Sequence, residues 1–337
     1  MTKLSLITEH SFKEGVTSLE LVDLTNNGKA NIVLSTMNGD IRVFEWTKGK
    51  KPRLKEIAKT SDLPPVAAMD VGDVLGNGIP DFVVAGLDNQ LRLLVFMDNE
   101  LTVKSIIPIG AIPTSLVVAN VLDDKSAEVI VSTTDQALRC YGWFDVVLDK
   151  LAHKVVDHPV LSMRRLSIEN VPYSRFVFGD ETGYLFVYQY ADDRLYEVWK
   201  TKVGKEVFHI ATGNIAGGRY DEIVCVSDQR TITLFRVEQQ ALDRVLTIKA
   251  PAPVTAVRMG RILQDTPAGQ ILLSLLDSTI LLLGFNGIEL IELASLKTAS
   301  KSAESLVAFG DITGDARNEI VQAIGNKIFL LRIDDED

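Results

Sequence analysis

The fold of this 337-residue chain is decided by the stretch Val16–Trp46, which reads VTSLELVDLTNNGKANIVLSTMNGDIRVFEW. It contains three short runs rich in β-branched and apolar residues, VTSLELVDL, ANIVLSTM and DIRVFEW, which predict three β-strands. Asn38-Gly39 separates the last two runs and predicts a type I′ hairpin turn, in which both central residues have positive φ. A sheet this small is only marginally stable alone, so the unit must pack against others.

The same unit recurs seven times along the chain. The first apolar residue of each third run serves as an anchor, and the anchors are Ile41, Leu91, Leu138, Leu185, Ile232, Ile280 and Ile328. Successive anchors are separated by 50, 47, 47, 47, 48 and 48 residues. A period in the forties with three or four short strands per unit is typical of a β-propeller. We therefore expect an all-β fold, a seven-bladed β-propeller.

The two ends of the chain predict how the ring closes. The seventh repeat ends with KIFLLRI and an acidic tail, so it lacks a fourth run. The N-terminal run Leu4–Phe12 has the length and alternation to supply it, and we expect it to pair outside Lys327–Ile333. Residues 1–337 would then form a single domain, with blades at approximately residues 13–62, 63–110, 111–157, 158–204, 205–251, 252–302, and 303–333 together with 2–12.

Composition excludes several classes of function. The formal net charge of −10 and the pI near 5.0 argue against a nucleic-acid-binding surface, which needs clustered Lys and Arg. The first ten residues lack the apolar core of a signal peptide. The longest apolar run, Ile271–Phe285, is too short to span a bilayer and contains Asp277. Cys140 and Cys225 lie in different repeats and do not form a disulfide framework. We expect an acidic cytoplasmic protein, monomeric on its own, that neither binds nucleic acid nor inserts into membranes.

A nine-residue loop joins the first run to the second run in the best-preserved repeats. It reads DLTNNGKAN from Asp23, DVLGNGIPD from Asp73 and DITGDARNE from Asp311, the last preceded by Phe309-Gly310. This pattern resembles the FG-GAP (VCBS-like) repeat of integrin α-subunit propellers, whose loop follows D-x-D-x-D-G-x-x-D/E. The resemblance covers essentially the whole chain. Without a secretion signal, the chain looks most similar to the intracellular group, which includes the integrin-α-like FG-GAP protein of the KICSTOR complex and the propellers of Bardet–Biedl complex subunits. That similarity implies a scaffold or assembly subunit.

Two of these loops are candidate calcium sites, because Ca²⁺ prefers carboxylate and other oxygen ligands. The seventh repeat is the stronger candidate, with Asp311, Thr313, Asp315 and Glu319. The first repeat is weaker, with Asp23, Thr25 and Asn27. The second and third repeats place Leu75 and Leu122 where an oxygen is needed, and the fourth and sixth repeats have lost the pattern. The alternative is that Asp, Asn and Gly persist because they build the turn itself, so that no cofactor binds.

Polar residues on the predicted inner strands indicate a charged central channel. They are His209, Arg164, Arg165, Arg258, Glu20 and Asp70. A channel of mixed charge is usually structural, and the chain lacks a coherent set of acid, base and nucleophile. We therefore expect a protein that is not an enzyme and has no catalytic residues.

Two surfaces are candidates for binding a partner protein. The turns between second and third strands should place one acidic rim on a single face, with Asp40, Asp88, Asp135, Asp180, Glu181, Asp228 and Asp277. Such a rim would suit a basic segment of a partner, although Asp also simply favours hairpin turns. The second candidate is Trp143-Phe144, which are large for an outer region and are either interface anchors or packing between blades.

The sequence thus supports three hypotheses of different classes. The first is a non-enzymatic protein–protein interaction scaffold, one subunit of an intracellular multiprotein complex. The second is a small-ligand or glycan-binding propeller, assisted by calcium, which exposed aromatic pockets between blades would favour. The third is an enzyme that uses the channel, which a cluster of His209 with unpaired carboxylates would favour.

Overall fold

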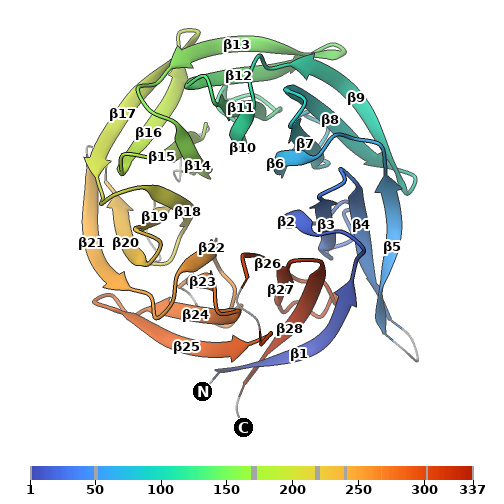
Figure 1. The fold of residues 1–337 in the computed structure, drawn as a ribbon, viewed down its shortest axis with the longest axis vertical. Helices are drawn as coiled ribbons and strands as arrows, with labels where there is room; N and C mark the ends of the chain where they lie inside the picture. The colour runs from blue at the N-terminus through green and yellow to red at the C-terminus, as the bar shows by residue number, and fades with distance from the viewer. Residues whose placement is uncertain are drawn as a thin grey trace.

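The computed structural model describes residues 2–48, 52–167, 173–216, 221–238, 241–266, 268–300 and 303–335. These residues form seven four-stranded antiparallel sheets, arranged as blades in a ring (Figure 1). The prediction of an all-β, seven-bladed β-propeller is confirmed. No helix long and apolar enough to cross a membrane occurs in these ranges.

Each blade runs from an inner strand beside the channel to an outer strand at the rim. The inner strands are β2 (Val16–Val22), β6 (Val66–Gly72), β10 (Pro113–Ala119), β14 (Val160–Leu166), β18 (Val207–Gly213), β22 (Val254–Gly260) and β26 (Ser305–Gly310). The second strands are β3 (Asn31–Thr36), β7 (Asp81–Gly86), β11 (Glu128–Thr133), β15 (Arg175–Asp180), β19 (Glu222–Ser227), β23 (Gln270–Leu275) and β27 (Glu319–Ile324). These two sets position every candidate site described below, because the predicted loops join one set to the other.

The outer half of each blade completes the sheet. The third strands are β4 (Ile41–Thr47), β8 (Gln90–Met97), β12 (Ala137–Phe144), β16 (Tyr184–Ala191), β20 (Thr231–Val237), β24 (Thr279–Phe285) and β28 (Lys327–Asp335). The fourth strands are β5 (Arg53–Thr60), β9 (Glu100–Pro108), β13 (Val147–Val155), β17 (Arg194–Lys202), β21 (Leu242–Lys249) and β25 (Leu290–Lys297), and the seventh blade takes β1 (Thr2–Ser11) instead.

The ring closes through both ends of the chain, as the sequence predicted. Strand β1 pairs antiparallel with β28, with Leu4 opposite Ile333 and Ser11 opposite Lys327. Phe12 continues the contact beyond the strand, because its N–H donates to the Asn326 carbonyl at 2.8 Å. The two termini therefore lie together at one blade (Figure 1).

The hydrophobic core lies between neighbouring blades and explains the dense apolar second runs. Strands β3, β7, β11, β19 and β23 are buried at every position. Their side chains pack across the gap to the next blade, as Val224 of β19 and Leu273 of β23 do in one shared cluster. Each fully buried Val, Leu or Phe contributes about 1.5–3 kcal/mol. Cys140 and Cys225 are buried free thiols in two different blades, as predicted.

The predicted type I′ turn at Asn38-Gly39 is wrong. Residues 37–39 form a three-residue loop closed by the Thr36 N–H, which donates to the Asp40 carbonyl at 2.9 Å. Within the loop the Gly39 N–H donates to the Thr36 carbonyl at 2.9 Å, and only Gly39 has positive φ, at 89°. A turn of this length is built on a type I bend followed by one left-handed residue. A Cβ at residue 39 would also lie 1.8 Å from the Leu63 carbonyl oxygen, so the position requires glycine for two reasons.

Candidate functional site

The central channel carries a single level of charged side chains. One position of the inner strand pairs with the third residue of the second strand in every blade, and its occupants are Glu20, Asp70, Val117, Arg164, Ala211, Arg258 and Ala308. Two acids therefore come from the first two blades, and two arginines come from the fourth and sixth blades. They meet only because the ring closes.

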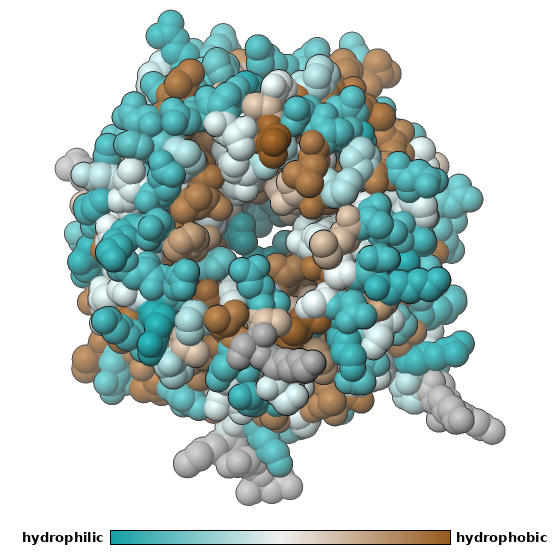
Figure 2. Space-filling view, viewed as in Figure 1, coloured by the Kyte–Doolittle hydropathy of each residue, from teal (hydrophilic) through white to brown (hydrophobic). Residues whose placement is uncertain are grey.

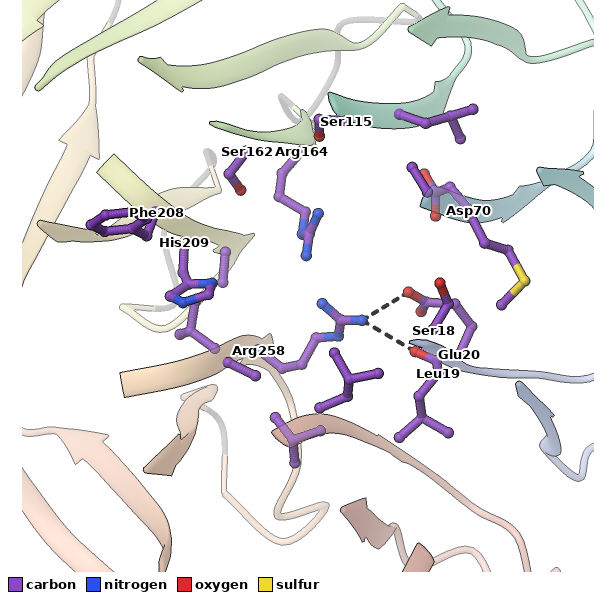
Figure 3. Close-up of a pocket in the computed structure, with 18 of the residues that line it drawn as sticks. Ser18, Leu19, Glu20, Asp70, Ser115, Ser162, Arg164, Phe208, His209 and Arg258 are labelled. Carbon is purple, nitrogen blue, oxygen red and sulfur yellow. Dashed lines mark hydrogen bonds and ion pairs between the residues drawn. The ribbon is translucent and has the colours of Figure 1, made fainter. Parts of the chain in front are cut away.

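Five of the six predicted channel residues line one cavity of about 510 Å³, together with small hydroxyl side chains (Figure 3). They are Glu20, Asp70, Arg164, His209 and Arg258. The sixth, Arg165, does not line the cavity and is exposed. Successive side chains of a strand point in opposite directions, so Arg164 and Arg165 cannot both face the channel.

The carboxylates of the channel are engaged by donors of the protein. Glu20 Oε1 accepts a hydrogen bond from Arg258 Nη2 at 2.8 Å. Asp70 accepts the Val118 N–H at 2.8 Å and the Val71 N–H at 2.9 Å. The arrangement predicted for an enzyme, His209 beside unpaired carboxylates, is therefore not the one found.

Burial dominates the electrostatics of this level. It raises the pKa of Glu20 and of Asp70. Burial and the neighbouring Arg258 lower the pKa of Arg164 to about 10. Burial, with Arg164 nearby, lowers the pKa of His209 to about 4, so its imidazole is neutral at neutral pH. The level thus combines two guanidinium groups with two carboxyl groups, and the neutral imidazole of His209 lies in the same cavity two residues away from it along β18.

The two candidate calcium loops hold their carboxylates in a different way. Asp311 Oδ1 accepts the N–H groups of Gly314 at 2.6 Å and Asp315 at 3.2 Å, and Oδ2 accepts the Ala316 N–H at 2.8 Å. Asp315 Oδ1 accepts the Arg317 N–H at 3.1 Å. These are the hydrogen bonds that the turn-building alternative requires.

The first repeat follows the same plan. Asp23 accepts the N–H groups of Thr25 at 3.2 Å, Asn27 at 3.2 Å and Gly28 at 2.7 Å, while Asn27 Oδ1 accepts the Lys29 N–H at 2.9 Å. Ca²⁺ requires six to eight converging oxygens. In both loops the side-chain oxygens face backbone N–H groups instead, so the residues as arranged do not form such a cage. Within the described ranges, no three His, Cys, Asp or Glu side chains converge as a metal site.

The last residue of the loop has a role that the sequence did not reveal. Glu319 is buried, and its Oε2 accepts the N–H groups of Ile312 at 2.9 Å and Thr313 at 3.0 Å, while its Oε1 accepts the Thr313 hydroxyl at 3.0 Å. The residue that opens the second strand makes the same kind of clamp in other blades, at Asn31, Asp81, Glu128, Glu222 and Gln270. We call these six side chains the loop clamps.

The sixth repeat has lost the sequence pattern of the loop but keeps its clamp. Gln270 Oε1 accepts the N–H groups of Ile262 at 2.9 Å and Leu263 at 2.7 Å, so an uncharged amide does what Glu319 does. The sequence comparison missed it because the sixth loop is one residue longer, which places Gly269 at the expected position. The fourth-repeat loop falls largely on residues 168–172, outside the described residues.

Three of the seven residues of the predicted acidic rim form salt bridges to arginine or lysine. Asp40 contacts Arg42 and Lys59, both at 2.9 Å, and Asp88 and Asp135 each contact the arginine four residues later at 2.5 Å. Arg92 lowers the pKa of Asp88, and Arg139 lowers the pKa of Asp135 to about 2. An arginine directly after the anchor in each of the first three repeats was the sequence signal for this pairing.

The remaining rim acids serve their own turns or lie at the surface. Asp180 Oδ1 accepts the N–H groups of Thr182 at 3.1 Å and Tyr184 at 2.8 Å, and Asp277 accepts the Thr279 N–H at 3.2 Å. Glu181 is exposed 3.9 Å from His158, and Asp228 is an exposed turn residue with a φ of 51°. Binding of a partner at this rim stays a prediction.

Trp143 and Phe144 separate into two environments. Trp143 is partly buried and packs against the core between the second and third blades. Phe144 is 46% exposed and ends β12, at a turn whose next residues include Val146, which is 77% exposed. Phe144 is the more exposed residue of the pair.

An aromatic groove of about 220 Å³ between the third and fourth blades was not predicted. Phe178, Tyr184, Phe186 and Tyr188 line it. Lys200 Nζ lies 4.5 Å from the ring centroid of Tyr184 and 4.9 Å from that of Phe186. The groove therefore already places a cation of the protein over two of its rings.

No protein-family model and no curated protein sequence matches the chain. Among solved structures, it is similar to BBS1N crystallised in complex with ARL6DN. A mercury-soaked crystal gives a TM-score of 0.72 at 10% identity over 98% of this chain and 97% of that one. A lead-soaked crystal gives 0.73 at 9% identity over 99% and 98%. The likeness is one of fold. It extends over the whole ring and leaves function to be argued from this chain's own surface.

Proposed function

We propose that the protein is a non-enzymatic protein–protein interaction scaffold, one subunit of an intracellular multiprotein complex. The observation that carries the proposal is a set of exposed apolar side chains at two neighbouring hairpin tips. These are Met97, Phe144 and Val146, which we call the tip patch. Large apolar side chains that stay exposed on neighbouring blades of one face are candidates for an interaction site.

The tip patch is built from equivalent positions of two adjacent blades. Met97 ends β8 and is 60% exposed, and Phe144 ends β12 in the next blade. Each lies beside a two-residue turn, since Met97 pairs with Glu100 and Phe144 with Val147. The outer strands that follow are in contact, because the Leu148 N–H of β13 donates to Ser105 Oγ of β9 at 3.4 Å. The two tips therefore emerge on the same face of neighbouring blades, and the β12–β13 tip lies beside the middle of β9.

Negative charge accompanies the tip patch. Asp98 and Asp145 occupy the two turns, with φ of 54° and 53°, and both are exposed. In contrast to Asp40, Asp88 and Asp135 of the opposite rim, neither has a salt bridge among the described residues. A partner that offers an apolar surface with basic residues around it would match this arrangement, and the charges would mainly raise the association rate.

The comparisons support the same class of function. BBS1N, a propeller of the same size, was crystallised in complex with a protein, ARL6DN. The FG-GAP-like loops add the resemblance to the KICSTOR and Bardet–Biedl propellers, which are subunits of assemblies. Both lines favour a protein partner, and neither identifies it.

The test compares two variants of the intact chain as bait in quantitative affinity capture from native lysate. One carries Met97→Ser, Phe144→Ser and Val146→Ser. The control carries Ile288→Ser, which removes an 84% exposed apolar side chain from the equivalent turn of the sixth blade. We expect a stoichiometric protein that the wild type and the control retain and the tip-patch variant loses, and that then binds in purified form. Equal recovery by all three baits would reject the tip patch.

The second candidate, a glycan- or small-ligand-binding propeller, has one observation in its favour, the aromatic groove. Such ligands stack on exposed aromatic faces, but Lys200 already covers the rings of Tyr184 and Phe186. The groove therefore favours this function less than the tip patch favours a protein partner.

A further inference from the structure

Arg164 in the channel has few hydrogen-bond acceptors among the protein's own groups. Arg164 donates from Nη1 to the carbonyl of Met163 at 2.7 Å, its own neighbour in the chain. No carboxylate of the described residues lies within ion-pair distance of it. A guanidinium group has donors on all three nitrogens, so most of its N–H groups face the cavity without an acceptor from the protein.

Arg258 enters the same space from the sixth blade. Its Nη2 reaches Glu20 Oε1 at 2.8 Å and the Leu19 carbonyl at 3.4 Å, which leaves its remaining donors on the side of the cavity. Figure 3 shows the guanidinium groups of Arg164 and Arg258 extending toward one another. Two like charges that face each other in a partly desolvated channel repel, and an anion between them removes that repulsion.

The acids of the level do not take this role. Asp70 is held on its own side by the N–H groups of Val118 and Val71, and Glu20 is held by Arg258. His209 is neutral and adds no charge at neutral pH. Glu20 and Asp70 attract Arg164 across the cavity without contacting it, so the donors of Arg164 that point to the middle of the channel have no acceptor from a side chain (Figure 3).

We propose that the channel binds a small oxyanion, of the phosphate or carboxylate class, between Arg164 and Arg258. The cavity of about 510 Å³ has room for such an ion with its water. Arginine suits it, because the planar fork of the guanidinium donates two parallel hydrogen bonds to a phosphate or carboxylate group. Ser115 and Ser162 line the same cavity and add hydroxyl groups. The face drawn in Figure 2 is open at its centre, so a solute reaches the channel from outside.

The site is separate from the tip patch and does not depend on the proposed function. A bound anion would tie the fourth blade to the sixth and so stiffen the inner edge of the ring. The proposal assigns Arg164 as the principal binding residue and Arg258 as the second, with Glu20 orienting Arg258.

The experiment titrates inorganic phosphate into the purified full-length chain by isothermal calorimetry, at constant ionic strength set with chloride. The wild type should show saturable binding at one site per chain. Arg164→Gln should weaken binding about tenfold to a hundredfold, because charge-assisted hydrogen bonds are lost. Arg165→Gln removes the same charge from the next residue, which is exposed and outside the cavity, and should bind like the wild type. A parallel titration with a dicarboxylate shows which of the two chemistries the site prefers.

Two results would overturn the proposal. One is the absence of saturable binding of both phosphate and the dicarboxylate by the folded wild type. The other is equal weakening by Arg165→Gln and Arg164→Gln, which would indicate general charge screening. If Arg164→Gln does not fold, as judged by circular dichroism, Arg164→Lys replaces it. Lysine keeps the charge but loses the fork, so it should bind more weakly than the wild type while remaining saturable.

Discussion

The loops contain buried polar and charged side chains and the channel contains partly buried ones, and the two regions satisfy them differently. In the loops, each clamp accepts N–H groups from the same repeat, as Glu319 does from Ile312 and Thr313. In the channel, side chains from different blades face one another, and Arg164 is left with a single backbone acceptor. The difference is one of distance along the chain. Charges that are satisfied locally build the turn, while ring closure pairs Glu20 with Arg258 and leaves Arg164 with donors open to the cavity.

The largest expected effect comes from removing a loop clamp. Glu319→Ala leaves two buried N–H groups and the Thr313 hydroxyl without their acceptor, and each such group costs about 1–3 kcal/mol. We expect the free energy of unfolding in urea to fall by about 3 kcal/mol or more. Glu319→Gln is the matched control and should cost less than about 1 kcal/mol, because Gln270 already performs this role. If the amide is as damaging as alanine, the negative charge itself is required, and the loop is more than a turn.

The next effect is a dependence of stability on pH. Burial raises the pKa of Glu128 in the folded state to about 7, from an ordinary 4.5. Between these values the folded protein binds more protons than the unfolded chain, so stability falls as pH rises from about 4.5 to 7. Glu128→Gln should remove about 2 kcal/mol of this fall, measured by urea unfolding across that range. Asp149→Asn, on an exposed position of the same blade, should leave the slope unchanged.

The fold could be predicted from the sequence because local patterns that recur in every repeat determine it. All seven anchors are buried members of third strands, from Ile41 in β4 to Ile328 in β28. The closing pair of β1 and β28 followed from one missing strand and one unassigned run. The turn at Asn38-Gly39 was mistaken because the dipeptide does not fix the loop length, which the pairing of Ser35 with Ile41 sets.

The site was only partly predictable for the opposite reason. The channel residues were found from strand position, except Arg165, whose side chain faces away. Which channel residues contact one another could not be predicted from the sequence, because Glu20 and Arg258 are 238 residues apart. Gln270 was missed because a single inserted residue shifted the loop against its neighbours. Of the tip patch, the sequence offered Phe144 but not Met97 and Val146, because their exposure depends on the turns that follow.

A smaller effect tests the pairing across blades in the channel. Glu20 and Arg258 form an ion pair at 2.8 Å, with side chains 23% and 22% exposed. Pairs that keep this much access to water are worth about 1 kcal/mol, since screening offsets much of the attraction. A double-mutant cycle with Glu20→Gln and Arg258→Gln should give a coupling energy of that size in urea unfolding. Coupling near zero would mean that Arg258 is held by its backbone contact and not by Glu20.

The smallest expected effect concerns calcium. In the loop from Asp311, both carboxylate oxygens of the first aspartate accept N–H groups, and both oxygens of Glu319 accept donors as well. A cation would have to displace hydrogen bonds that the turn itself needs, so its net binding energy would be small. We expect millimolar Ca²⁺, compared with EDTA, to shift the melting temperature by less than about 1 °C. A ligand at a hundred times its Kd would instead stabilise the fold by about 2.7 kcal/mol and give a larger shift. A larger shift that Asp315→Asn removes and Asn27→Ala does not would establish the seventh-repeat site, because Asp315 and Asn27 hold equivalent loop positions and only Asp315 is a carboxylate. Such a result would make this loop a second region, beside the channel, whose charged side chains bind an ion in addition to the chain's own groups.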